Sequence, residues 1–165
     1  SKSVIIGVTG DTHNNLKNIK TICSIFVENR ADLVLHTGDI SLPKSLLAFK
    51  ELNCPIIAVL GNNDIGDEKY LREVSKEFRC EIFCEPYTIE IEERIITLIH
   101  HPDLINEEML KKSDVILHGH THMHRHEKIN GCLIFNPGEC AGFMEGKNQV
   151  GIIDLKNMKP KVINF

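Results

Sequence analysis

The sequence predicts an α/β fold in which two mixed β-sheets pack face to face between outer helices, a four-layer α-β-β-α sandwich. The first half of the chain alternates short apolar runs with helical patterns, which is typical of a parallel sheet. The second half holds closely spaced β-rich runs with a helix among them, which indicates a second, more antiparallel sheet. The 165 residues, 42% of them apolar and 25% charged, are enough for one domain with a hydrophobic core, residues 1–165.

Each predicted strand of the first half is a short apolar run that ends in a polar loop. A helix over 16–29 is predicted from apolar residues at helical spacing behind an asparagine that can cap its first turn. Pro43 can open the next helix, because its missing N–H is not needed in a first turn. A third helix is predicted over 67–77. The strands are predicted over residues 4–8, 33–36 and 56–60.

The second half is predicted to be mainly β. Asn130 and Gly131 stand between two β-rich runs and form the strongest short signal for a hairpin. The helix among these strands is predicted over 106–111. The strands are predicted over residues 80–84, 87–91, 95–99, 115–118, 123–129, 132–135, 150–155 and 161–165.

Charge and composition argue against several classes of protein. The formal net charge of −4 gives no basic surface for nucleic-acid phosphates, so no nucleic-acid partner is expected. No apolar run approaches about 18 residues and no signal-peptide pattern is present, so neither membrane insertion nor secretion is expected. The six cysteines form no Cys-x-x-Cys pair and several lie in apolar runs, which predicts reduced core thiols in a cytoplasmic protein.

Five predicted apolar strands end in loops that carry aspartate, asparagine or histidine. In open α/β sheets, ligands collect beyond the carboxyl ends of the strands, so these side chains are expected to converge. Turn and cap chemistry explains each motif taken alone, but not five of them in this order, each at a strand end. The pattern therefore predicts a metal site. Its residues are Asp11, His13, Asp39, Asn62, His100, His120 and His122.

The donor set suits two divalent ions. Two cations about 4 Å apart need a bridging carboxylate and a bridging water or hydroxide, and Asp39 is central in the set. Oxygen and nitrogen donors without sulfur suit Mn, Fe, Co, Ni or Zn, and manganese is the metal we expect first. One ion would take Asp11, His13, Asp39 and His122, and the other would take Asp39, Asn62, His100 and His120.

These motifs resemble the signature of the calcineurin-like metallophosphoesterases. The resemblance rests on Asp11-x-His13, Gly38-Asp39, Gly61-Asn62-Asn63-Asp64, a strand-end histidine and Gly119-His120-Thr121-His122. The chain length and the segment Asn136-Pro137-Gly138-Glu139 resemble the small single-domain phosphodiesterase branch of bacteria and archaea. The resemblance covers nearly the whole chain and implies the same ligand roles and the same four-layer fold.

The resemblance also implies a reaction. We expect hydrolysis of a small phosphate ester, most of all a diester, by a bridging hydroxide that attacks phosphorus in line with the leaving oxygen. The catalytic residues would be Asp39, as the bridge, with Asn62 and Asn63 hydrogen-bonding the phosphoryl group. A homodimer or higher homo-oligomer is left open.

Two positions depart from the family pattern. Many members have histidine at the position of Asn63, where it helps to protonate the leaving group, although the small branch often has asparagine there. The usual His-Gly-His after the later strand reads His100-His101-Pro102, so His101 replaces a glycine. Strand register makes His100 the expected ligand, because it directly follows the apolar run over 97–99.

The alternative function is a protein-interaction scaffold, since a eukaryotic retromer subunit resembles this fold and has a degraded metal site. The seven competent donors favour an enzyme over that scaffold. Of the other polar side chains, His36 and His118 are expected to be hydrogen-bonded core residues. His124, His126 and Arg125 are expected on a solvated strand face, although Arg125 could instead contact substrate phosphate.

Overall fold

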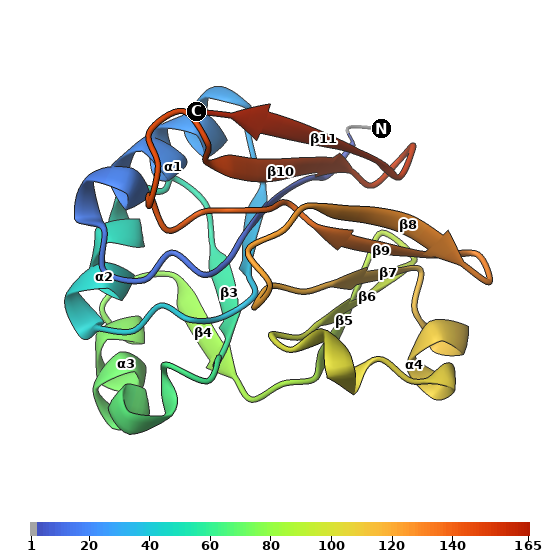
Figure 1. Cartoon of the computed structure of the whole chain (residues 1–165), viewed down its shortest axis with the longest axis horizontal. Helices are drawn as coiled ribbons and strands as arrows, with labels where there is room; N and C mark the ends of the chain where they lie inside the picture. Colours follow the sequence, from blue (N-terminus) through green and yellow to red (C-terminus); the bar gives the residue numbers. More distant parts are fainter. Residues whose placement is uncertain (1–2) are drawn as a thin grey trace.

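A computed structural model describes residues 3–165 and contains a mixed sheet of six strands (Figure 1). Strands β1 to β4 run parallel to one another, β10 pairs antiparallel with β1, and β11 pairs antiparallel with β10. The order across the sheet is β11 (Lys159–Asn164), β10 (Gln149–Asp154), β1 (Ile5–Thr9), β2 (Leu33–His36), β3 (Ile56–Val59) and β4 (Cys80–Phe83).

The second sheet has five strands. Its centre is parallel, because β7 pairs in parallel with both β6 and β9, while the edge strands β5 and β8 pair antiparallel with their neighbours. The order is β5 (Tyr87–Ile91), β6 (Arg94–Leu98), β7 (Val115–Leu117), β9 (Cys132–Asn136) and β8 (Arg125–Ile129).

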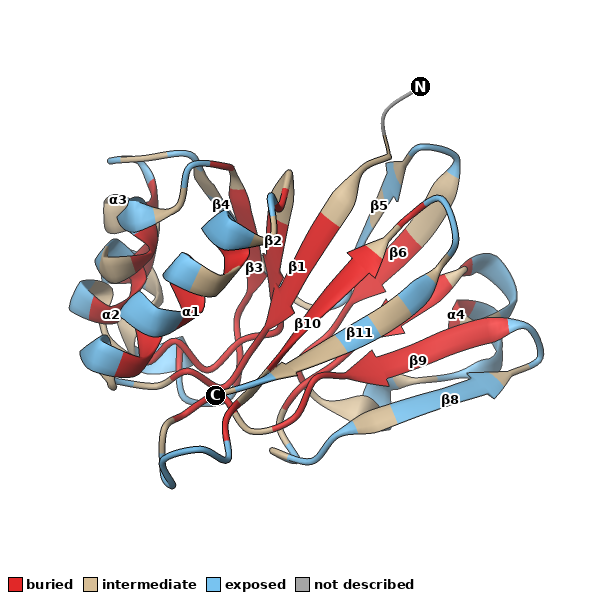
Figure 2. Cartoon of the chain, turned by 90° about the horizontal axis from the view of Figure 1, so that it is seen from above, coloured by how far each residue is buried: buried red, intermediate tan, exposed pale blue. Residues whose placement is uncertain are grey.

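Helices flank the two packed sheets and confirm the predicted α-β-β-α sandwich (Figures 1 and 2). Three helices cover the outer face of the first sheet, and α4 (Glu107–Lys112) covers the second. Short 3₁₀ turns lie at Ala48–Glu51, Ile65–Asp67 and Pro102–Leu104. The helices on the first sheet are α1 (Leu16–Glu28), α2 (Pro43–Leu47) and α3 (Glu68–Ser75).

The core lies between the sheets and follows from the two-residue period of the strands. In β3, Ile57 and Val59 face the second sheet, whereas Ile56 and Ala58 face the helices. All four side chains are less than 10% exposed, which is why this strand reads as an uninterrupted apolar run.

Glycine allows close approach where the two sheets meet. Phe135 on β9 is fully buried, and its ring lies against Gly151 on β10. A Cβ at that glycine would come within 2.5 Å of the ring. On the outer face of the first sheet, Phe26 of α1 packs over Gly7 at a similarly short distance. The helix begins behind Asn15, whose side chain accepts the N–H of Asn18 at 2.9 Å.

Sheet membership differs from the expectation in three respects. β4 belongs to the first sheet, parallel to β3, and the centre of the second sheet is parallel rather than antiparallel. Strands β10 and β11 join the first sheet. Apolar periodicity tells which residues are strand but not which strand pairs with which, because pairing is decided by the packing of the whole chain.

Local features agree more closely. The hairpin at Asn130 and Gly131 is confirmed: both have positive φ, and Ile129 pairs with Cys132 across a two-residue turn. Strand β8 begins at Arg125 rather than Met123, because the preceding residues turn back with φ +58° at His122. Within residues 3–165, no helix combines the length and apolar character needed to cross a membrane.

The cysteines are unpaired, as expected. Four of the six are buried, Cys80 is partly buried and Cys84 is exposed. Burial raises the pKa of the thiols of Cys23, Cys80 and Cys140 to about 12, so these groups stay protonated and pack as small apolar side chains.

Candidate metal centre

The loops that follow β1, β2, β3, β6 and β7 converge at one edge of the two sheets. Backbone hydrogen bonds fasten them together: Asp11 donates to the carbonyl of Gly38 at 2.8 Å, and Gly119 donates to that of His100 at 3.1 Å. The side chains that the sequence singled out are gathered here in two adjoining groups. They are Asp11, His13, Asp39, Asn62, His100, His120 and His122.

Most of these residues have a backbone conformation that side chains other than glycine rarely adopt. Left-handed backbone costs on the order of 1–3 kcal/mol per residue, although aspartate and histidine tolerate it better than most, and it collects at functional sites. The loops therefore give up stability to aim these donors. The φ angles are +48° at Asp11, +49° at His13, +61° at Asp39, +73° at His120 and +58° at His122.

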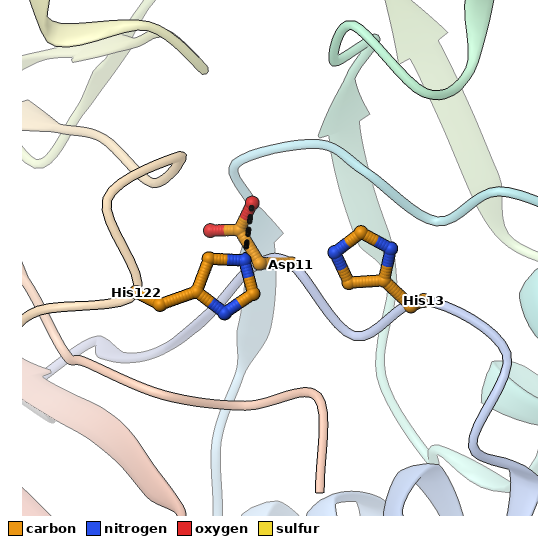
Figure 3. A group of neighbouring side chains, drawn as sticks. All are labelled: Asp11, His13 and His122. Atoms are coloured by element: carbon orange, nitrogen blue, oxygen red, sulfur yellow. Dashed lines mark ion pairs between the residues drawn. The ribbon is translucent and has the colours of Figure 1, made fainter. Parts of the chain in front are cut away.

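The first group contains Asp11, His13 and His122 (Figure 3). His122 Nε2 lies 3.8 Å from Asp11 Oδ1, and the rings of the two histidines are stacked with centroids 5.5 Å apart. One ligand atom from each residue lies within 4.8 Å of the others, a spacing at which all three can contact one cation.

The second group contains Asn62, His100 and His120. Asn62 Oδ1 lies 2.7 Å from His100 Nε2 and 3.3 Å from His120 Nδ1, and the two histidine nitrogens are 3.3 Å apart. Asp39 stands between the groups, with its Oδ2 3.5 Å from His100 Nε2 and 3.9 Å from His13 Nε2. Its carboxylate therefore lies beside a histidine nitrogen of each group.

Hydrogen bonds hold two of the histidine rings from behind. His100 Nδ1–H donates to the carbonyl oxygen of Thr37 at 3.0 Å, which leaves Nε2 as the nitrogen that faces Asn62 and Asp39. The His13 ring is held through Nδ1, 3.3 Å from Ser41 Oγ. Partners of this kind fix the tautomer and orientation of metal-binding imidazoles.

Glu139 plays the same part for His122, and sequence reasoning missed it. The Glu139 carboxylate accepts a hydrogen bond from His122 Nδ1–H at 3.0 Å, which turns Nε2 toward Asp11. The available signal was the Asn136-Pro137-Gly138-Glu139 segment, which the sequence marked without assigning a contact.

Asp64 was also missed, and it joins two of the loops. Its buried carboxylate accepts three backbone N–H groups, from Asp39 at 2.8 Å, Ser41 at 2.6 Å and Gly61 at 2.8 Å. The loop after β2 is thereby bound to the loop after β3. Burial raises the pKa of Asp64, although the three donors act in the opposite direction.

One oxygen of the buried Asp11 carboxylate has no hydrogen-bond donor among the protein groups around it. Asp11 is 1% exposed, and its Oδ1 is buried without a hydrogen-bond donor. Burial raises the pKa of this carboxyl, because the charged form has lost water. A bound cation would supply the missing positive partner, and the oxygen and nitrogen donors around it suit a divalent metal. The residues present therefore fit a metal site.

Comparison with known proteins decides the family. Residues 4–158 match the family model of the calcineurin-like phosphoesterase superfamily domain. The chain belongs to this superfamily. It is 35% identical over 164 residues to the phosphodiesterase MJ0936 of Methanocaldococcus jannaschii, which covers 96% of this chain and 97% of that protein. The chain is accordingly identified as a phosphoric ester hydrolase of the small calcineurin-like type.

Solved structures agree. An archaeal phosphodiesterase superposes with a TM-score of 0.84 at 31% identity, covering 98% of this chain and 100% of that one. Vps29 of Chaetomium thermophilum superposes with a TM-score of 0.71 at 14% identity, covering 98% of this chain and 94% of that one. The second likeness shows the fold alone.

Two side chains at which this phosphoesterase departs from the family pattern have defined places. Asn63 donates its side-chain N–H to Asp39 Oδ2 at 3.0 Å and its backbone N–H to Asp39 Oδ1 at 2.9 Å. His101 stacks on the ring of His120 with centroids 4.1 Å apart, and its Nδ1 accepts the backbone N–H of Asp103 at 3.1 Å. His101 therefore packs beside the second group instead of pointing between its donors.

The two core histidines are confirmed. His36 is fully buried; its Nδ1 accepts the N–H of Gly38 at 3.0 Å and its Nε2 donates to Thr12 Oγ1 at 2.9 Å. Burial lowers the pKa of His36 to about 3, so the ring is neutral. His118 is also buried, donates to the carbonyl of Gly119 at 2.9 Å, and has a pKa lowered by burial.

The solvent exposure expected for His124 and His126 is confirmed. Arg125 contacts Glu127 and donates to His118 Nε2 at 3.3 Å, so it is engaged with neighbours on its own side of the sheet.

Proposed function

We propose that this protein is a phosphodiesterase that acts as a single catalytic domain with two divalent metal ions, manganese in first place. One ion is bound by Asp11, His13, Asp39 and His122, the other by Asp39, Asn62, His100 and His120. The observation that carries the proposal is the position of the Asp39 carboxylate between the two groups, within 3.9 Å of an imidazole nitrogen on either side.

Bound cations would lower the pKa of a water molecule, so that hydroxide is available near neutral pH, and would screen the phosphoryl oxygens. Hydrolysis would form a bond between a water oxygen and phosphorus and break the bond from phosphorus to the leaving ester oxygen, which would take up a proton from water. The chain's own residues orient the reaction. The Asp39 carboxylate lies between the two groups of ligands. Asn62 and Asn63 offer amide groups at the mouth of the centre, where both are exposed.

The scaffold alternative is less well supported. All seven ligand positions carry competent donors, and their supporting residues Thr37, Ser41 and Glu139 are in hydrogen-bonding positions as well. The relative with the phosphodiesterase name shares 35% identity over nearly the whole of both chains, whereas the likeness to Vps29 concerns the fold.

The test is Asp39→Asn, which keeps the size of the side chain but removes its charge. Wild type should bind two metal ions per chain and cleave bis(4-nitrophenyl) phosphate when loaded with manganese. Asp39→Asn should bind fewer than two and lose turnover by at least about 1,000-fold, because a bridging charge is missing. Glu145→Gln, which removes one carboxylate charge from an exposed loop residue, is the matched control and should behave like wild type. Two bound metals and a wild-type rate in Asp39→Asn would refute the two-metal proposal.

A further inference from the structure

An exposed aromatic ring borders the metal centre on one side. Phe143 is 71% exposed, yet its ring stacks on the imidazole of His122 at 5.7 Å with an interplanar angle of 13°. The same ring lies 6.4 Å from that of His13. Phe143 and the next residue, Met144, which is 63% exposed, together form apolar surface beside a polar centre, and exposed apolar patches are characteristic of binding sites.

The loop that carries Phe143 is anchored to the body of the protein. Gly142 and Gly146 flank it with φ +79° and +78°, and a Cβ at Gly142 would lie 2.3 Å from the Asn15 side chain on the adjacent helix start. Gly142 donates its N–H to Asn148 Oδ1 at 2.9 Å, and the same asparagine donates to the carbonyl of Met144 at 3.4 Å. These contacts set the base of the loop, so the position of the ring follows from the fold.

Two more exposed apolar side chains lie next to Phe143 and His122 in the chain. Beside Phe143 stands Met144, 63% exposed, and Met123, which directly follows His122, is 70% exposed. The other side of Asp39 is bordered instead by Asn62, Asn63 and His101, all of them polar. An anionic group bound over the metals would therefore have the Phe143 ring as an apolar neighbour on the His122 side.

We propose that Phe143 contacts an aromatic group carried by the phosphodiester substrate, and that it thereby selects diesters with a planar apolar substituent. This inference rests on the proposed function and specifies the substrate class of the same site. The ring of Phe143 lies nearly parallel to that of His122 and leaves most of its surface open to the solvent. Offset or edge-to-face pairing with a second ring adds favourable energy beyond burial alone.

Binding of two anions that cannot be cleaved tests the inference independently of turnover. Diphenylphosphinate and dimethylphosphinate each carry one negative charge and have C–P bonds in place of ester bonds. The manganese-loaded wild type should bind the diphenyl anion more tightly than the dimethyl anion by about tenfold. Phe143→Ala should reduce that preference by about fivefold or more while leaving the dissociation constant of dimethylphosphinate unchanged. Phe143→Trp should retain the preference, as should Tyr70→Ala, which removes an exposed aromatic ring from α3.

An equal preference for diphenylphosphinate in wild type and Phe143→Ala would overturn the inference and favour a contact with another macromolecule. Turnover of bis(4-nitrophenyl) phosphate is measured alongside. If wild type cleaves the diester but Phe143→Ala keeps the preference, only the inference fails. If wild type cleaves no diester, the proposed function fails, and the phosphinate preference still reports on Phe143.

Discussion

At the scale of single residues, the centre depends on side chains that are held from two sides. His100 is 1% exposed and directs Nε2 toward Asp39, because Nδ1 is committed to the Thr37 carbonyl. His101, the next residue, points to the outside of His120. The imidazoles of His100 and His101 thus have different environments although the residues are adjacent in the chain. Of the two, the ring of His100 is the one that faces the other ligand atoms.

Removing each imidazole in turn should separate these environments. We expect His100→Ala to weaken binding of one metal ion by at least about 100-fold, since even supporting residues are worth 10–100-fold in metal affinity. His101→Ala should change affinity by less than about tenfold, because it removes a stacking partner rather than a ligand. Manganese titration of both variants gives the ranking, and the reverse ranking would reassign the ligand to His101.

Asn63 should leave a mark on the choice of leaving group. The amide of Asn63 can donate a hydrogen bond but cannot transfer a proton to the leaving group at neutral pH. Proton transfer by a general acid is worth about 10²–10⁴-fold in rate. Diesters with activated aryl leaving groups should therefore be cleaved well and alkyl esters slowly, and Asn63→His should raise activity on poor leaving groups most. The measurement is log kcat/KM against leaving-group pKa. Asn63→Ala controls for the lost hydrogen bond to Asp39; a flat dependence in wild type would contradict the argument.

At the scale of elements, the centre requires that five loops come closer than most side chains allow. Gly119, between β7 and His120, is one of the tight points. A Cβ there would lie 2.5 Å from Asp11 Oδ2 and 2.6 Å from Thr37 Oγ1. The loop after β7 meets the loops after β1 and β2 only because this position has no side chain.

Gly119→Ala should therefore weaken metal binding while the protein still folds. The added methyl must displace the Asp11 carboxylate, and overpacking costs about 1–3 kcal/mol of unfolding free energy. Gly66→Ala is the matched control, because no atom lies within 4 Å of the Cβ it adds. Urea unfolding and metal titration are measured on both variants. Wild-type metal affinity in Gly119→Ala would show that the loops have more room than the distances indicate.

The elements themselves could be predicted well from the sequence, and the gathering of the ligand loops followed from them. Periodicity located the strands to within about two residues, and parallel strands bring their carboxyl ends to one edge. Sheet membership of β4, β10 and β11 could not be predicted, because the sequence of an apolar strand does not indicate which strand it pairs with. Nor could Asp64 and Glu139 be assigned, since their hydrogen bonds depend on loop geometry and not on a spacing in the chain.

At the scale of the whole molecule, acid should destabilise the fold through His36. The pKa of this ring is about 3 in the folded protein and about 6.5 in an unfolded chain, so between these values only the unfolded state binds the proton. Stability is therefore full above pH 6.5 and falls as the pH drops toward 3. The contribution lost between pH 7 and pH 4 is about 3 kcal/mol.

Urea unfolding of the wild type and His36→Gln at several pH values checks this expectation. The variant should be less stable at pH 7, since it loses buried hydrogen bonds, but the difference should shrink as the pH falls. Asp11 and Asp64, whose pKa values are raised by burial, are present in both proteins and cancel in the comparison. A constant difference from pH 7 to pH 4 would show that another group carries the acid sensitivity.

The position of β10 beside β1 has a consequence for the synthesis of the protein on the ribosome. Ile5 pairs with Asp154, so the centre of the first sheet joins a residue to a partner that the ribosome adds much later. While residues 149–154 are still inside the exit tunnel, the edge of β1 that pairs with β10 stays open. The nascent chain therefore presents an unpaired strand edge until residues 149–154 leave the tunnel, and this edge is a surface at which chains can associate wrongly or a chaperone can bind.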